Sequence, residues 1–137
     1  MIDEKIFINL EKIAKELVAP EKLNKYVSIG DVSCALITDK GNIYTGINID
    51  TSCSLGFCAE HSAISEMLKN REYNIKAIVA INENYNPIPP CGRCRELISQ
   101  ISEKNTKTYI KVSKDKILQL KDLLPLDWKD VKKEPII

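Results

Sequence analysis

Apolar residues recur every three or four positions at the start of the chain, with charged residues between them. They are Ile6, Leu10, Ile13 and Leu17. This spacing is that of one face of a helix, and a proline following such a pattern ends it. The pattern therefore predicts an amphipathic helix over residues 4–18, closed by Pro20.

The next apolar positions follow a different pattern. Residues 32–38 read VSCALIT, a polar Asp-Lys-Gly-Asn follows, and residues 43–47 form a second short run. Two short runs around a tight turn of this kind predict a β-hairpin. Residues 76–82, KAIVAIN, are a continuous apolar run, typical of a strand buried on both faces, and the Asn- and Pro-rich ENYNPIPP after it predicts a loop.

The remaining segments alternate between helical and extended patterns. A helix is expected from Cys58, with apolar residues at 59, 63, 64 and 67 on one face, and another is opened by Pro90, with 97, 98 and 101 on its inner face. Residues 106–112 predict a strand, and residues 114–124 a short helix. This order predicts an α/β fold, a three-layer α/β/α sandwich with a mixed central sheet. No repeat or linker divides it, so one domain over residues 1–137 is expected.

Charge and composition narrow the class of partner. Twenty basic and nineteen acidic residues give a net charge of +1, which offers no general field for nucleic acid or an anionic membrane. No apolar run approaches the length of a membrane span, and the N-terminus carries charges among its apolar residues. We expect a cytoplasmic protein with a small-molecule substrate, no nucleic-acid partner and no membrane association.

The cysteines carry the candidate chemistry. Their number, five, and their sparse spacing do not suit a disulfide framework, and in a reducing compartment a Cys-x-x-Cys pair more often binds metal or performs redox chemistry. Cys91 and Cys94 form such a pair, which we place in the first turn of the helix opened by Pro90. Cys58 opens another helix, where backbone N–H groups favour a thiolate. Cys34 falls within a strand and is expected in the core, and Cys53 has no assigned role.

Three thiolates form one kind of catalytic zinc site, in which a fourth position stays open for water. Glu60, two residues after Cys58, is close enough to such a site to take a proton from that water. We therefore predict one Zn²⁺ per chain, held by Cys58, Cys91 and Cys94, with Glu60 as the catalytic proton shuttle. Three alternatives remain open: a redox pair, a closed structural zinc site with His61 as fourth ligand, and a zinc-stabilised binding module without turnover.

The combination of Cys-Ala-Glu at 58–60 with Pro-Cys-Gly-Arg-Cys at 90–94 resembles the zinc deaminases. The chain is similar to the small homo-oligomeric cytidine deaminases from the first hairpin to Trp128, and Pro-Cys-Gly-Arg-Cys-Arg is similar to the blasticidin S deaminases. The resemblance implies hydrolytic deamination of a free cytosine nucleoside, cytidine or deoxycytidine, with a cytosine-containing antibiotic as the alternative substrate. It also implies a homotetramer or homodimer.

The same resemblance implies the residues that bind substrate: Asn48, Asp50, Ala59 and Trp128. Asp50 is one methylene shorter than the glutamate found in these enzymes, and Gly30 stands where they carry a phenylalanine against the pyrimidine ring. Trp128 has a second interpretation, as a residue that caps the core.

His61 is a third departure, since many three-cysteine relatives read Cys-Ala-Glu-Arg, with the arginine donating hydrogen bonds to the thiolates. Three thiolates and Zn²⁺ carry a net charge of −1, so a donor to sulfur would restore the Lewis acidity of the metal. His61 and Arg95 are the candidates, and Arg95 is the preferred one. His61 also has a third interpretation, as an ordinary residue without a role.

Overall fold

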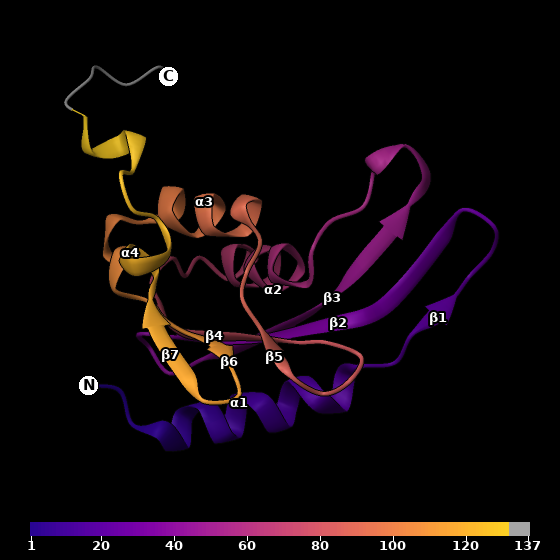
Figure 1. Ribbon diagram of the computed structural model, residues 1–137, viewed down its shortest axis with the longest axis horizontal. Coiled ribbons are helices and arrows are strands. Elements are labelled where there is room, and N and C mark those ends of the chain that lie inside the picture. The colour runs from indigo at the N-terminus through magenta and orange to yellow at the C-terminus, as the bar shows by residue number, and fades with distance from the viewer. Residues whose placement is uncertain (132–137) are drawn as a thin grey trace.

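The computed structural model describes residues 1–131 as a mixed β-sheet with helices on both faces (Figure 1). The helices are α1 Glu4–Leu17, α2 Ala59–Lys69, α3 Gly92–Ile101 and α4 Leu120–Leu123. The strands are β1 Glu21–Lys22, β2 Val27–Thr38, β3 Ile43–Thr51, β4 Ile75–Ile81, β5 Pro87–Ile88, β6 Tyr109–Ser113 and β7 Lys116–Gln119. The predicted α/β/α sandwich is confirmed. The expectation of one domain over residues 1–137 extends to residues 132–137, which lie outside the described residues.

The sheet runs in the order β3, β2, β4, β6, β7, with the short strands β1 and β5 beside β2 and β4. Only the β4–β6 pair is parallel in the described residues, and the other pairs are antiparallel, which makes the sheet mixed. Figure 1 shows α1 on one face and α2 and α3 on the other. The far ends of β2 and β3, with β1, extend beyond the helices.

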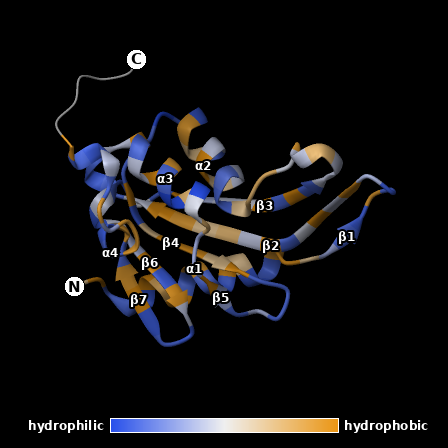
Figure 2. Cartoon of the chain, turned by 45° about the horizontal axis from the view of Figure 1, so that its top comes forward, coloured by the Kyte–Doolittle hydropathy of each residue, from blue (hydrophilic) through white to orange (hydrophobic). Residues whose placement is uncertain are grey.

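Successive side chains of a strand point to opposite faces of the sheet, so the core has two parts, one on each face. On β4, Ala77 and Val79 pack against α1, whereas Ile78 faces the side of α2 and α3. Apolar residues accordingly concentrate in the central strands between the helices (Figure 2). The residues expected on the inner face of α2 are buried there: Ala59, Ala63, Ile64 and Met67.

The predicted hairpin is confirmed but longer at both outer ends, since β2 begins at Val27 and β3 continues to Thr51. The turn at Gly41 has a φ of +83°, which favours glycine. The expected loop after β4 contains the two-residue strand β5, which pairs back onto β4. None of the helices in residues 1–131 has both the length and the apolar character that crossing a membrane requires.

Near the C-terminus, one predicted strand is confirmed with a later start, and one predicted helix is wrong over most of its length. The strand expected from residue 106 begins at Tyr109, because residues 103–107 form a 3₁₀ turn in which the buried Asn105 side chain binds backbone groups. Its Oδ1 accepts from Ile75 N at 2.8 Å, and its Nδ2 donates to Ile98 O at 3.0 Å. The helix expected over 114–124 is a strand, β7, followed by α4, because residues 116–119 pair antiparallel with β6.

Candidate metal centre and adjoining cavity

Two helices begin at the same site on one face of the sheet, and a cysteine occupies the N-cap of each. Cys58 is the N-cap of α2 and Cys91 the N-cap of α3. The prediction that Cys91 lies in the first turn is therefore wrong. Helix α3 begins at Gly92, and Cys91 before it has extended backbone angles. Cys94 does lie in that turn and is fully buried. Neither N-cap sulfur makes a capping hydrogen bond, which leaves both available to bind a metal.

The three sulfurs form a compact cluster. Cys91 Sγ lies 3.5 Å from Cys58 Sγ and 3.5 Å from Cys94 Sγ, and Cys58 Sγ is within 4.8 Å of Cys94 Sγ. None of the three is in a disulfide. Two sulfurs bound to one tetrahedral zinc at about 2.3 Å stand about 3.8 Å apart, so the donor set fits a zinc ion.

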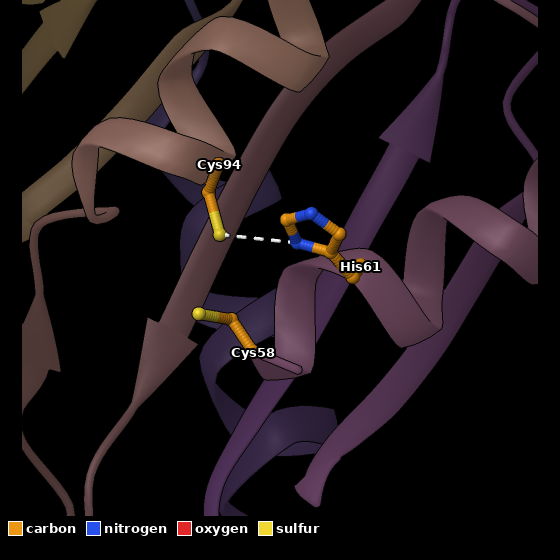
Figure 3. Close-up of side chains that lie close together, drawn as sticks. All are labelled: Cys58, His61 and Cys94. Carbon is orange, nitrogen blue, oxygen red and sulfur yellow. Dashed lines mark hydrogen bonds between the residues drawn. The ribbon is translucent and has the colours of Figure 1, made fainter. Parts of the chain in front are cut away.

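His61 joins this cluster from the first turn of α2. Its Nδ1 lies 3.4 Å from Cys94 Sγ, and Figure 3 shows the ring pointing across from α2 toward that sulfur. Its position suits an N–H donor to the thiolate and also a fourth ligand. Burial lowers the pKa of His61, and the charge of Arg93 lowers it further, which favours the neutral ring.

Arg95, the preferred donor to the thiolates, makes other hydrogen bonds. Its Nε donates to Pro90 O at 2.8 Å, and its Nη1 donates to Leu123 O at 3.3 Å. Arg95 thus ties the start of α3 to the end of α4, and among the described residues no hydrogen bond joins it to a cysteine. The side chain that contacts sulfur is His61.

Glu60 lies beside the cluster, and its side chain is almost completely shielded from solvent. The residue is 5% exposed, and its carboxylate accepts no hydrogen bond of normal geometry from another described side chain. Burial raises the pKa of Glu60, and its own backbone N–H and the Cys94 thiol offset this only in part. A carboxyl group in these surroundings holds and releases a proton more readily near neutral pH than an exposed one.

The height of α2 above the sheet depends on Gly46 of β3. A Cβ at this position would lie 2.4 Å from Ala63 N and 2.5 Å from Ser62 Cβ. The missing side chain lets the helix backbone rest directly on the strand. Gly46 thereby fixes the position of Cys58 and Glu60, one turn earlier on α2.

A cavity of about 570 Å³ opens from the cluster. Cys58, Glu60 and Cys91 line it at one end. The remaining lining residues come from β2, β3, the loop after β3, the start of α2, β5 and the residue after it, and the start of α3: Asp31, Val32, Asn48, Ile49, Asp50, Thr51, Ser54, Gly56, Phe57, Ala59, Ile88, Pro89 and Arg93. Three of the four predicted substrate-binding residues, Asn48, Asp50 and Ala59, are among them.

Trp128 lies elsewhere. Its indole Nε1 donates to Glu96 Oε1 on α3 at 3.1 Å, and Lys129 Nζ contacts the same carboxylate at 2.8 Å. Trp128 is 54% exposed, so it caps no core, and it does not line the cavity of its own chain. Cys34 is buried in the core as predicted, and Cys53 is exposed.

Asn48 is held by an irregularity in the sheet. The β2–β3 register shifts between Ile29 and Ser33, and Val32 N donates to Asn48 Oδ1 at 2.9 Å across this gap. Nδ2 of Asn48 has no hydrogen-bond partner among residues 1–131. The amide N–H₂ is therefore available as a donor to a molecule in the cavity.

Sequence reasoning missed Asp31, Phe57 and Arg93 as lining residues. Phe57 and Arg93 are direct neighbours of the cysteines, a signal that could have identified them. Asp31 has no such signal, because it enters the cavity through the register shift in β2.

Comparison with known sequences connects this site to one family. A sequence model described as "Cytidine and deoxycytidylate deaminase zinc-binding region" matches residues 9–110. The cytidine deaminase of Sporosarcina psychrophila is 30% identical over 105 residues, which cover 75% of this chain and 77% of that protein. That of Mycoplasma genitalium is 31% identical over 106 residues, 74% of this chain and 80% of that protein. The cytidine deaminase of Halalkalibacterium halodurans is 31% identical over 80 residues, 58% of this chain; the chain spans 61% of that relative's length.

Solved structures with the same fold include cytidine deaminases of two mycobacteria. The Mycobacterium tuberculosis protein superimposes with a TM-score of 0.75 at 21% identity, covering 93% of this chain and 98% of that one. The Mycobacterium leprae protein gives 0.73 at 24% identity, covering 87% and 97%. At these identities the likeness establishes the fold.

Proposed function

The chain belongs to the cytidine and deoxycytidylate deaminase family of zinc-dependent hydrolases, and we propose that it deaminates a free cytosine nucleoside, cytidine or deoxycytidine. The reaction consumes one water and gives the uracil nucleoside and ammonia. The observation that carries the proposal is the juxtaposition of three unpaired thiols with the buried carboxyl group of Glu60 at the end of one cavity.

The residues proposed to hold zinc are Cys58, Cys91 and Cys94. Burial raises the pKa of the Cys94 thiol, and the negative charge of Glu60 raises it further. A divalent cation offsets this cost of ionising buried thiols, because a coordinating thiol is deprotonated. When bound, zinc acts as a Lewis acid that makes water nucleophilic at neutral pH. The proposed role of His61 is to donate its Nδ1–H to the Cys94 sulfur.

Glu60 is the proposed proton carrier. It would take one proton from the attacking water and deliver it to the ring nitrogen next to the amine-bearing carbon. It would then take the second proton from the hydroxyl group formed at that carbon and give it to the departing amine, which leaves as ammonia. Its raised pKa suits both directions of transfer, because general acid–base catalysis is most efficient when the pKa lies near the working pH.

Asn48 and Asp50 are the proposed contacts to the sugar hydroxyls, and Ala59 the proposed contact to the base. Both polar residues lie on β3 at alternate positions, so that their side chains point to the same side of the strand. A free nucleoside is favoured over a nucleic-acid strand by the size of the cavity, about 570 Å³, and by the net charge of +1.

Ammonia release from a panel of substrates tests the proposal. Zinc-loaded protein is incubated with cytidine, deoxycytidine, deoxycytidylate and blasticidin S, and zinc per chain is measured on the same sample. We expect turnover of the two nucleosides. Turnover of deoxycytidylate alone or of blasticidin S alone would contradict the nucleoside assignment and identify that compound as the substrate. One zinc per chain with no ammonia from any of the four would favour the binding module. The homo-oligomeric state, the cytoplasmic location and a role for Trp128 in substrate binding stay predictions.

A further inference from the structure

Phe57 is the one aromatic ring that lines the cavity within residues 1–131. It directly precedes Cys58 in the chain, and both residues line the cavity. The residue is 36% exposed, although a large aromatic side chain is normally buried when it serves the core. It belongs to neither of the two hydrophobic clusters on the faces of the sheet. Core packing therefore does not account for this ring.

The backbone holds Phe57 firmly in place. Phe57 N donates to Ile49 O at 3.0 Å, and Ile49 N donates to Phe57 O at 3.0 Å, although the two residues belong to different segments. Gly56 makes this approach possible, because a Cβ there would lie 1.8 Å from Ile49 O. The backbone that carries the ring is thus fixed to the part of β3 that carries Asn48 and Asp50. A rigidly placed ring loses little entropy when a ligand packs on it.

The orientation of the ring is fixed as well. The rings of Phe57 and His61 are nearly parallel, with an angle of 16° between their planes and 6.3 Å between their centroids. His61 in turn contacts Cys94, as Figure 3 shows. The plane of the Phe57 ring is therefore set relative to the sulfur cluster, where a substrate must present its reacting carbon.

The β2 side of the cavity offers no comparable surface. Gly30 has a φ of +80°, and a Cβ there would lie 2.3 Å from Ala19 O, so no side chain fits at this position. The neighbouring residues that do line the cavity, Asp31 and Val32, are not aromatic. Among the described residues that line the cavity, Phe57 is the only aromatic side chain on which a planar ring could stack.

We propose that Phe57 is a specificity-determining residue that packs against the planar base of the substrate and directs its amine-bearing carbon toward the sulfur cluster and Glu60. This assignment rests on the proposed deaminase function. Aromatic packing of this kind contributes mainly to binding, so it acts on KM and on the affinity for product more than on kcat.

The test compares Phe57→Leu, Phe57→Tyr and Leu55→Ala with the wild-type protein. Leucine keeps an apolar side chain without the flat ring, tyrosine keeps the ring, and Leu55 lies in the same loop, 79% exposed and outside the cavity lining. KM and kcat for cytidine, the dissociation constant of uridine by calorimetry, and zinc per chain are measured for each. We expect Phe57→Leu to raise KM and the uridine constant about fivefold with little change in kcat. Zinc content should stay unchanged, and the other two variants should resemble the wild type.

The outcomes separate the two levels of the proposal. Unchanged uridine affinity and KM in Phe57→Leu, with an active wild type, would overturn the role of Phe57 alone. Loss of zinc in Phe57→Leu would also overturn it, because the ring would then serve only to support His61. A wild-type protein that binds zinc yet neither releases ammonia from cytidine nor binds uridine would overturn the deaminase function and the role of Phe57 together.

Discussion

Glu60 and Glu72 stand near the two ends of α2, and they are buried to almost the same degree, 5% and 6% exposed. Their surroundings differ completely. Glu72 accepts hydrogen bonds from Thr38 Oγ1 at 2.6 Å, from Asn42 Nδ2 at 2.9 Å and from the hydroxyl of Tyr44. Glu60 accepts none of normal geometry from the other described side chains and faces the cavity.

The two pKa values move in opposite directions as a result. Burial raises the pKa of Glu60, whereas the hydrogen bond from Thr38, followed by that from Tyr44, lowers the pKa of Glu72. The Glu72 carboxylate accepts hydrogen bonds at both oxygens, which connects the β2–β3 hairpin to the end of the helix and favours the ionised form. A buried carboxyl group whose few partners leave its pKa raised is available for proton transfer. We infer that the carboxyl group at the start of α2 serves the proposed reaction, whereas the one after its end serves stability.

Removal of a thiol at the functional end should have the largest effect. We expect Cys94→Ala to lose zinc and, with it, essentially all deaminase activity, because a three-ligand site needs each of its ligands. Cys34→Ala is the matched control, since Cys34 is equally buried and lies on β2 outside the cluster. Metal analysis and ammonia release measure both variants. Zinc retained at wild-type affinity in Cys94→Ala would exclude Cys94 as a ligand.

Loss of the carboxylate at the other end should affect folding alone. In Glu72→Gln the amide cannot accept three hydrogen bonds as well as the carboxylate does, and we expect the melting temperature to fall by roughly 3–8 °C. Activity per folded, zinc-loaded chain should be unchanged. Thermal unfolding and ammonia release are the measurements. Full stability of Glu72→Gln together with reduced activity would contradict a purely structural role for Glu72.

The pH dependence of stability should show a smaller effect. Because the folded pKa of Glu72 lies below its ordinary value of 4.5, its contribution is complete above that pH and is lost as the pH falls through the folded pKa. The hydrogen bond to Glu72 raises the pKa of Tyr44 from 10.0 to about 12, so stability is also lost as the pH rises through that range. The urea midpoints of the wild type and Glu72→Gln should therefore differ most at pH values above the pKa of Glu72 and below that of Tyr44. At more acidic and more alkaline pH the two midpoints should converge. A difference that does not vary with pH would show that Glu72 acts through packing.

The sequence predicted the cysteine cluster and the glutamate beside it better than their surroundings. Cys58, Glu60 and Cys94 could be placed because both motifs sit at helix starts, where spacing along the chain fixes geometry. The partners of Glu72 could not, since Thr38 and Tyr44 reach it only through the folded hairpin. Phe57 is marked in the sequence only by its place next to Cys58, and its position in the cavity depends on the pairing of its backbone with Ile49.

Contacts between segments distant in the sequence also explain where the predicted secondary structure was wrong. The first part of β2 was missed because Gly30 and Asp31 interrupt the apolar pattern there. The segment that forms β7 was predicted as a helix because its apolar residues are compatible with either structure, and pairing with β6 decides between them. Interactions between distant segments, which no local pattern records, settled both.

Ammonia release from cytidine per bound zinc, measured for Glu60→Gln beside Glu72→Gln, tests the central claim most directly. We predict full zinc content in both variants, a loss of activity of about 10²–10⁴-fold or more in Glu60→Gln, and wild-type activity in Glu72→Gln. Zinc-loaded Glu60→Gln that keeps wild-type activity would contradict the assignment of proton transfer to Glu60.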